Sequence, residues 1–230
     1  MRTTWITLLG LAMGVTGTAA QTDTRPGIAV LPFDNGGSYG RDKEDFDALQ
    51  VGLAQMLITE LATNPKARLV DRRIIRQVLE EQDLGASGRV DAETAAKVGK
   101  LVGARYVVTG GFIDFYGDLR IDARIVDVET SEILKAEQVR DKRSNLFPLV
   151  TSLSTQVMEG VSLPPLPPAV QRERQSRKTP PEDAMNDYLR GLLASDRGDK
   201  DRARQLFRRA IDQFPEFTEA EQELRQLGTS

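Results

Sequence analysis

The stretch RVDAETAAKVGKLVGARYVVTGGFIDFYGDLRIDARIVDVETSEIL, residues 89–134, decides the fold, and it begins with a helix. Asp91 is a favourable N-cap, and alanine, valine and leucine recur after it at the spacing of one helical face. Gly103 accepts the left-handed backbone conformation in which many helices end. The first part of the stretch therefore predicts an amphipathic helix that ends at Gly103.

Three strands are expected after this helix. Residues 106–115 are rich in β-branched and aromatic side chains, which favour a strand. Residues 119–125 alternate between apolar and charged side chains, which is typical of a strand with one buried face. Turn-forming residues occupy 116–118 and 129–132, so the chain should return at Ile133 as a third strand. The stretch therefore predicts an antiparallel meander beside the helix.

The segments on either side of this stretch complete one domain. Residues 27–33 are almost all apolar, as in a strand covered on both faces. Residues 45–62 carry one apolar helical stripe, residues 67–70 resemble a short strand, and a further helix follows Asp71. After the meander, an amphipathic helix is predicted over 146–157. This order predicts an α/β fold with a mixed parallel and antiparallel sheet packed with helices.

The first twenty residues have the layout of a cleaved secretory signal. Arg2 precedes an apolar run from Trp5 to Val15, and small residues lead up to Ala20. A membrane-spanning helix needs about 20 apolar residues, and this run is about half as long. We therefore expect export to the periplasm and cleavage after Ala20. Loss of Arg2 changes the formal net charge from −3 to −4, which does not favour binding to nucleic acid.

The 230 residues contain neither cysteine nor histidine. The absence of cysteine excludes disulfides, thiol chemistry and a lipid attached to a cysteine at the cleavage site. The absence of histidine removes the commonest general base and the commonest transition-metal ligand. We therefore predict a non-catalytic protein without a cofactor or metal, and not a lipoprotein.

Four runs of sequence together resemble one family. They are IAVLPFDN at 28–35, LVDRRIIRQVLEEQDL at 69–84, KVGKLVGARYVVTGG at 97–111 and RIVDVETSEIL at 124–134. In this order they are similar to the CsgG-type family of bacterial envelope proteins, which includes the curli secretion subunit, and to TolB amino-terminal-like and LpoB-like periplasmic domains. The resemblance covers residues 26–160. It implies an exported domain that binds other envelope proteins or assembles with them, further copies of itself included, without catalysis.

The chain departs from the curli subunit in two respects. That subunit is a lipoprotein whose membrane-crossing β segments are inserted around the meander, whereas this chain has no cysteine and joins Phe115 to Leu119 through three residues. Membrane-crossing strands need about 9 to 11 residues each. We therefore expect an accessory or adaptor protein in envelope assembly or in secretion of surface structures. A pore-forming outer-membrane secretion subunit is the alternative, and a serine hydrolase that uses Ser38 is the least favoured.

The loop after the first strand contains a pattern known from hydrolases. Residues 36–40, GGSYG, match the nucleophile motif G-x-S-x-G. Because the chain offers Ser38 no histidine base, a glycine-rich loop without catalytic function is favoured. The alternative is a small ligand bound by the backbone amides of residues 34–40, at the carboxyl end of a central strand.

For two features of the meander, a structural role is favoured over a binding role. Because charged and apolar residues alternate along the strand, Asp122, Arg124 and Asp127 are expected to form a solvated or cross-strand-paired face. A binding face is the less favoured interpretation. Gly110 and Gly111 lie inside a predicted strand, where glycine indicates a bulge or a close backbone contact.

The last third of the chain changes in composition. Residues 163–180 are rich in proline, which predicts a semi-rigid, partly extended linker. The four basic side chains within 172–178 would allow peripheral contact with anionic lipid, although a solvated linker is favoured. The chain is therefore divided into a signal peptide (1–20), a CsgG/TolB-like α/β domain (21–162), this linker (163–180) and a helical unit (181–230).

The helical unit resembles a tetratricopeptide repeat. Residues 184–217 span the 34 residues of that repeat, with small and large side chains at its spacing, and a third helix follows as a cap. One repeat exposes an apolar face that must be covered by the α/β domain, by a second copy or by a partner, and we expect an external partner. The residues predicted to bind it are Tyr188, Leu192, Phe207, Phe217 and Leu224.

Overall fold

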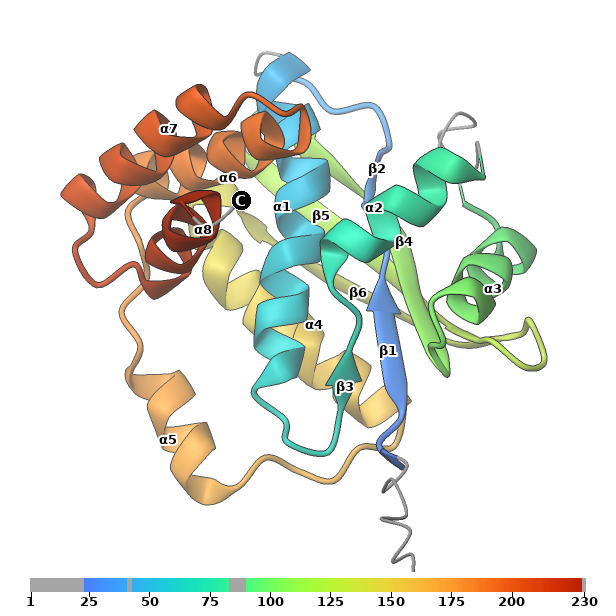
Figure 1. The fold of residues 1–230 in the computed structure, drawn as a ribbon. Helices are drawn as coiled ribbons and strands as arrows, with labels where there is room; N and C mark the ends of the chain where they lie inside the picture. The colour runs from blue at the N-terminus through green and yellow to red at the C-terminus, as the bar shows by residue number, and fades with distance from the viewer. Residues whose placement is uncertain (1–22, 41–42, 83–89, 229–230) are drawn as a thin grey trace, which may run out of the picture.

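The computed structural model describes residues 23–40, 43–82 and 90–228, so the predicted signal peptide lies outside the described residues. A sheet of mixed strand direction forms the centre of the molecule (Figure 1). Its order is β3-β1-β4-β5-β6, with β2 also pairing with β4. The strands are β1 (Gly27–Val30), β2 (Asp34–Asn35), β3 (Arg68–Leu69), β4 (Tyr106–Phe115), β5 (Asp118–Asp127) and β6 (Ile133–Lys142).

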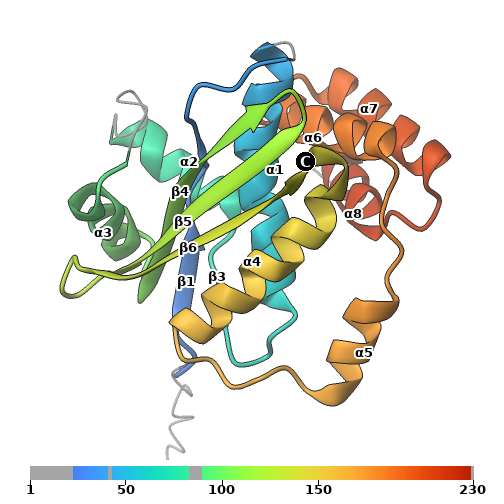
Figure 2. The same ribbon diagram turned by 180° about the vertical axis from the view of Figure 1, so that it is seen from behind.

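Helices cover both faces of this sheet (Figures 1 and 2). Helices α1 and α4 pack on one face, and α2 and α3 pack on the other. The side chains of β1 alternate between these two cores, which confirms the prediction of a strand covered on both faces. The helices are α1 (Lys43–Ala62), α2 (Arg72–Glu81), α3 (Ala92–Leu101), α4 (Leu146–Gly160), α5 (Pro168–Ser176), α6 (Glu182–Asp196), α7 (Lys200–Gln213) and α8 (Thr218–Gly228).

The helix and meander predicted over 89–134 are confirmed. The Asp91 side chain accepts a hydrogen bond from the Thr94 backbone N–H at 2.8 Å and so caps α3. Strands β4, β5 and β6 pair antiparallel in sequence order, while β1 pairs parallel with β4. The predicted mixed sheet packed with helices is therefore the observed fold.

The glycines of β4 allow close backbone contacts. A Cβ atom at Gly110 would lie 2.0 Å from the carbonyl oxygen of Asp122, and one at Gly111 would lie 3.0 Å from that of Asp34. The second contact lies where β2 pairs with β4. The sequence pattern predicts a loop, rather than a strand, at the residues that form β2. Of the two predicted roles of these glycines, a bulge or a close backbone contact, the structure confirms the close contact. An irregularity in strand register does occur, but between Ile125 and Val126.

The predicted extended linker contains a helix. Pro168 stands at the first position of α5, where proline is favourable because its missing N–H needs no partner there. Arg174 and Arg177, in and just after this helix, form ion pairs with Glu60 of α1, so the segment is docked on the α/β domain. Composition alone indicated an extended chain because it carries no information about a partner 114 residues away.

The C-terminal helices pack on the α/β domain, which corrects the expectation that an external partner covers them. Helix α6 crosses α1 at Gly52, where the Leu189 side chain occupies the place that a Cβ atom would take. Arg190 of α6 also pairs with Asp45 of α1, with N and O atoms 2.7 Å apart. The apolar face of the unit is therefore covered by α1, within the same chain.

Candidate functional site

A cluster of exposed apolar side chains lies at the end of the β4–β5 hairpin. We call it the aromatic tip and define it as Tyr39, Ile113, Phe115 and Tyr116. Their exposed fractions are 61%, 39%, 58% and 73% respectively. The Phe115 and Tyr116 rings meet edge to face with centroids 5.0 Å apart, and the Tyr39 ring lies 6.2 Å from that of Phe115. Rings of this size are rarely left together in solvent unless they serve an interaction.

Backbone hydrogen bonds hold the aromatic tip in place. The Tyr39 N–H donates to the Asp114 carbonyl at 2.8 Å, and the Tyr116 N–H donates to the Tyr39 carbonyl at 3.1 Å. Upstream, the Gly36 N–H donates to the Phe112 carbonyl at 2.8 Å. The loop that carries Tyr39 therefore continues the sheet beside β4, and the rings are presented on ordered backbone.

Tyr116 adopts a conformation that is unfavourable for its residue type. Its φ is 53°, and Gly117 follows with φ of 90°, so both central residues of the two-residue hairpin turn are left-handed. Asparagine, aspartate or glycine normally occupies the first of these positions, and a bulky residue there costs about 1 kcal/mol or more. Because the ring is largely exposed, burial does not offset this strain. A strained and exposed aromatic residue points to a functional role.

A buried ion pair stabilises the turn formed by Tyr116 and Gly117. Asp114 and Arg143 are almost wholly buried, and their side chains lie 3.1 Å apart. The Asp114 carboxylate also accepts the Gly117 N–H, and the Arg143 N–H donates to the Gly117 carbonyl, both at 2.8 Å. Arg143 donates further to the Asn186 side chain of α6 at 3.3 Å. The aromatic tip is thus connected to the C-terminal helices as well as to the sheet.

Ser38 serves the structure of this loop. Its hydroxyl donates to the Asn35 side-chain oxygen at 2.7 Å and accepts the Asp114 backbone N–H at 2.9 Å. Asn35 accepts the Ser38 N–H as well, at 2.9 Å. These bonds close the loop against β4, and they engage the hydroxyl that a nucleophile would need free.

The substitution Ser38→Ala should therefore lower stability. It leaves the Asp114 N–H without its acceptor, which should reduce the free energy of unfolding by about 1 to 2 kcal/mol in urea denaturation. Ser176→Ala, at an exposed serine, is the matched control and should change it by less than about 0.5 kcal/mol. An unchanged stability together with loss of any hydrolysis of a simple ester would contradict the structural role of Ser38.

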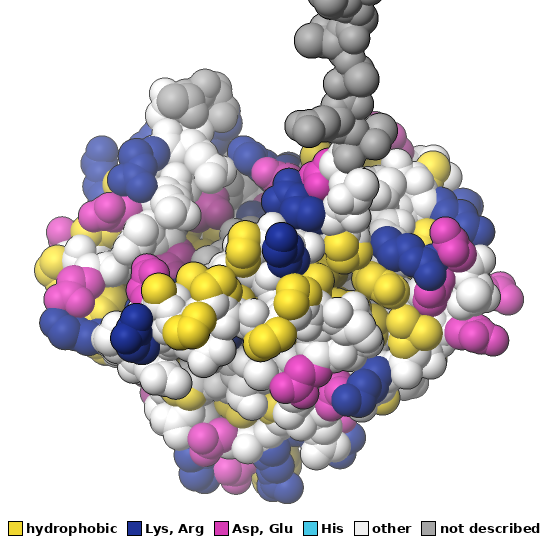
Figure 3. All heavy atoms as spheres, turned by 90° about the horizontal axis from the view of Figure 1, so that it is seen from below, with side chains coloured by type: hydrophobic (Ala, Val, Ile, Leu, Met, Phe, Trp, Pro, Cys, Tyr) yellow, Lys and Arg dark blue, Asp and Glu magenta, His cyan; other side chains and the backbone are white. Residues whose placement is uncertain are grey.

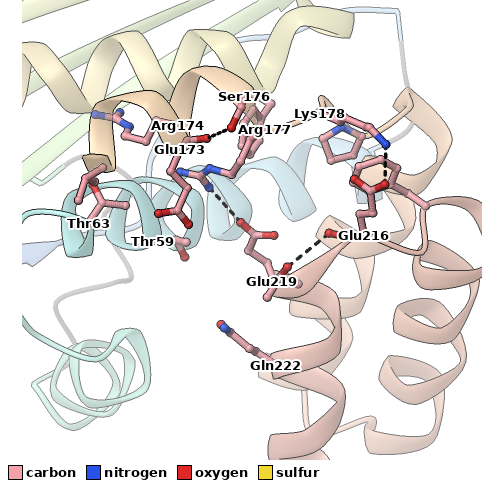
Figure 4. A pocket seen from close by; sticks show the side chains of 15 residues that line it. Thr59, Thr63, Glu173, Arg174, Ser176, Arg177, Lys178, Glu216, Glu219 and Gln222 are labelled. Atoms are coloured by element: carbon pink, nitrogen blue, oxygen red, sulfur yellow. Dashed lines mark hydrogen bonds and ion pairs between the residues drawn. The ribbon is translucent and has the colours of Figure 1, made fainter. Parts of the chain in front are cut away.

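A cleft of about 650 Å³ lies between α1, α5 and the C-terminal helices (Figure 4). Two arginines that line the cleft, Arg174 and Arg177, each lie 2.8 Å from the carboxylate of Glu60, a buried residue of α1. Arg177 reaches on to Glu219 of α8 at 3.5 Å, and its guanidinium lies over the Phe147 ring. Because its basic groups are matched by carboxylates, the cleft acts as a junction rather than as an anion site.

The residues predicted to bind a partner form the interior of the helical unit. Tyr188, Leu192, Phe207 and Phe217 are at most 2% exposed, and Leu224 is half-buried. The Tyr188 ring lies 4.9 Å from that of Phe217 and 6.0 Å from that of Phe207. Burial raises the pKa of the Tyr188 hydroxyl well above its usual value. In this structure these side chains belong to, or pack against, the same hydrophobic core as the apolar residues of α1.

The charged residues of the meander are not brought together. Asp122 pairs with Arg120 on the exposed surface at 2.8 Å. Asp127 is buried at the far end of β5, where it accepts the Glu129 N–H and pairs with Arg105. Asp122 therefore lies on a solvated face, although its partner Arg120 is in the same strand, whereas Asp127 is buried and its partner Arg105 precedes β4. Within residues 23–40, 43–82 and 90–228, no group of three acidic, histidine or cysteine side chains is arranged to bind a metal ion.

Part of the chain matches a known family. Residues 13–120 match the family model for the curli production assembly/transport component CsgG. The matched region contains β1 to β4 and the whole aromatic tip, and it ends before α4 to α8. No curated protein matches the sequence. None of the described helices has both the length and the hydrophobicity needed to cross a membrane.

Several solved structures are similar in fold. The C-terminal domain of LpoB from Escherichia coli is 18% identical over 54% of this chain and 87% of its own, with a TM-score of 0.41. TolB from Acinetobacter baumannii is 19% identical over 61% of this chain and 29% of its own, with a TM-score of 0.41. A PelC dodecamer from Paraburkholderia phytofirmans is 14% identical over 64% of this chain and 94% of its own, with a TM-score of 0.34.

Sequence reasoning missed the aromatic tip as a site. The available signal was the FYG run at 115–117, where an aromatic residue precedes glycine in a turn that normally takes asparagine or aspartate. Tyr39 gave no such signal, because its approach to Phe115 depends on the pairing of the loop with β4.

Proposed function

We propose that this protein is an exported, non-catalytic periplasmic protein that binds other envelope proteins, as an adaptor in envelope assembly or in secretion of surface structures. The observation that carries the proposal is the match of residues 13–120 to the CsgG family model. The secretory layout of the first twenty residues supports export. The lack of histidine and the engaged Ser38 hydroxyl favour binding over catalysis.

The aromatic tip is the surface that we assign to partner binding. Tyrosine and phenylalanine are enriched in protein interfaces, and tyrosine is enriched among the residues that dominate their binding energy. A backbone that is already ordered loses little conformational entropy on binding, and hydrogen bonds fix the backbone of Tyr39 and Tyr116. The tip therefore offers a preorganised apolar surface on a domain similar to the matched family.

The geometry of the β4–β5 hairpin argues against the alternative of a pore-forming subunit. Strands β4 and β5 pair along their whole length, from Tyr106 opposite Asp127 to Phe115 opposite Asp118. Only Tyr116 and Gly117 connect them. A membrane-crossing insertion of about 9 to 11 residues per strand therefore has no place in this turn.

In-cell crosslinking tests the proposed function. A photo-crosslinking amino acid at Tyr116 should give adducts with envelope proteins in intact cells, identified by mass spectrometry. The same probe at Lys97, an exposed residue of α3, is the control and should not give those adducts. Identical products from the two positions, or none from Tyr116, would overturn the assignment of the tip to partner binding.

A further inference from the structure

One side of the meander lies largely open to solvent beside the aromatic tip. Among the described helices, α2 and α3 pack on this side at the end of the strands away from the β4–β5 turn, where Val107 and Val126 join their core. Nearer the turn, the side chains on this side are charged or polar. We call this region the open face and define it as Arg120, Asp122 and Arg124 of β5 with Gln138 and Arg140 of β6.

Two arginines meet across the strands of the open face. The pairing of β5 with β6 places Arg140 directly opposite Arg120. Like charges in such positions destabilise a sheet, so stability does not explain this arrangement. Arg120 donates two N–H groups to the carboxylate of Asp122, at 2.8 and 3.1 Å. The side chain of Arg140 forms no hydrogen bond or ion pair in the part of the chain that the structure describes.

The open face carries more positive than negative charge. Its one carboxylate, that of Asp122, stands against three arginines, and Arg124 forms no hydrogen bond or ion pair with any described residue. The neighbouring Asp118 does not supply the missing charge, because Lys142 lies 2.6 Å from its carboxylate. Their hydrogen bond is the main cause of the lowered pKa of Asp118, and the charge of Arg140 is the smallest cause. Two guanidinium groups are therefore available to a partner.

The open face is continuous with the aromatic tip. Ile113 lies opposite Arg120 in the pairing of β4 with β5, and Phe115 lies opposite Asp118. Protein interfaces commonly combine aromatic contacts of this kind with polar groups at their rim. Figure 3 shows the other end of the molecule from below, where apolar side chains gather in a band of their own. We assign that band no partner, because nothing in the described structure covers it.

We propose that the open face and the aromatic tip together bind an acidic surface of another envelope protein. This proposal rests on the proposed function, since it gives the chemistry of the partner of the surface assigned above. Arginine presents its N–H donors in a planar fork that matches the two oxygens of a carboxylate. The partner therefore places aspartate or glutamate side chains against Arg124 and Arg140, and apolar side chains against Ile113 and Phe115.

The arrangement of charges favours single carboxylates over a uniformly anionic surface such as a membrane. Asp122 lies among the arginines of the open face, and the pair of Asp118 and Lys142 lies beside them. A surface that is negative throughout would be repelled by both aspartates. A protein can place its carboxylates opposite the arginines alone. The binding of anionic lipid usually needs a larger cluster of basic side chains.

Photo-crosslinking from both parts of this surface tests the proposal. A photo-crosslinking amino acid at Gln138, an exposed residue of the open face, should give adducts with the same envelope protein as the probe at Tyr116. Mass spectrometry should place the adduct from Gln138 close to an aspartate or glutamate of that protein. Arg140→Glu should lower the yield of both adducts by about tenfold or more, because it places like charges against each other.

Three controls separate a lost charge contact from a lost fold. Arg208→Glu makes the same change at an exposed arginine of α7 and should leave both yields unchanged. Melting curves of Arg140→Glu should lie within about 2 °C of the wild type, since the exposed side chain forms no ion pair. Replacing the partner's acidic residue at the crosslinked site with arginine should restore the adducts of Arg140→Glu.

The outcomes separate this inference from the proposed function. Adducts from Tyr116 whose yield is unchanged by Arg140→Glu, or the absence of adducts from Gln138 alone, would overturn the inference and leave the proposed function standing. Arg140 would then serve only to keep the edge strand β6 apart from other chains. Adducts only with further copies of this chain would overturn the inference, and no adducts from either position would overturn both proposals.

A vesicle experiment distinguishes a membrane from a protein partner. The wild type should not sediment with vesicles of phosphatidylethanolamine and phosphatidylglycerol. Sedimentation that is lost in Arg140→Glu and kept in Arg208→Glu would identify anionic lipid as the occupant of the open face and overturn the inference.

Discussion

Replacing Gly110 with valine is expected to reduce the free energy of unfolding by about 3 kcal/mol or more. A Cβ atom at this position would lie 2.0 Å from the Asp122 carbonyl oxygen and 3.0 Å from the Ala123 Cα. Both are backbone atoms of β5, and Ala123 lies directly opposite Gly110 in the pairing. Backbone in the centre of a sheet cannot turn away as a flexible side chain can, so β4 and β5 must separate.

Urea denaturation followed by circular dichroism measures this loss. Gly228→Ala is the control, because a Cβ atom there meets nothing within 4 Å. Alanine at that helical position should leave stability unchanged or raise it by up to about 1 kcal/mol. If Gly110→Val matched this control, the observed register of β4 against β5 would be wrong.

Replacing Glu60 with alanine should reduce the free energy of unfolding by about 3 kcal/mol. The Glu60 side chain is 3% exposed and is shared by two guanidinium groups, those of Arg174 and Arg177. Arg174 is itself 9% exposed, so loss of the carboxylate leaves a desolvated charge without its counter-ion. The same loss removes the contacts that hold α5 against α1.

Two measurements follow from this substitution. Urea denaturation reports the loss of stability, and trypsin cleavage after Arg174 and Arg177 reports release of α5, which should become faster. Glu80→Ala is the matched control, since that carboxylate is 70% exposed and lies 3.7 Å from Arg76. A surface pair of this kind contributes about 0 to 1 kcal/mol. Equal effects of the two substitutions would show that α5 is held by other contacts.

The helices and strands of the α/β domain could be predicted from the sequence because their signals are local. A cap at Asp91, a terminating Gly103 and alternation from Leu119 to Ile125 each act within a few residues. The close approach at Gly110 was also predictable, since glycine inside a strand is typical of a bulge or a close backbone contact. Local propensity and tertiary packing agree in these segments.

The tertiary structure alone decided how distant segments meet. Glu60 forms an ion pair with Arg174, which lies 114 positions later in the chain. This contact holds α5 against the domain, in a proline-rich stretch whose composition predicts a linker. Tyr39 joins Phe115 only because the intervening chain folds its loop along β4. Helix α1 covers the C-terminal helices where an external partner was expected. The physical reason is the same in each case: periodicity and capping specify the conformation of a segment, whereas the partner of an exposed ring or a charged side chain depends on which surfaces the folded chain brings together.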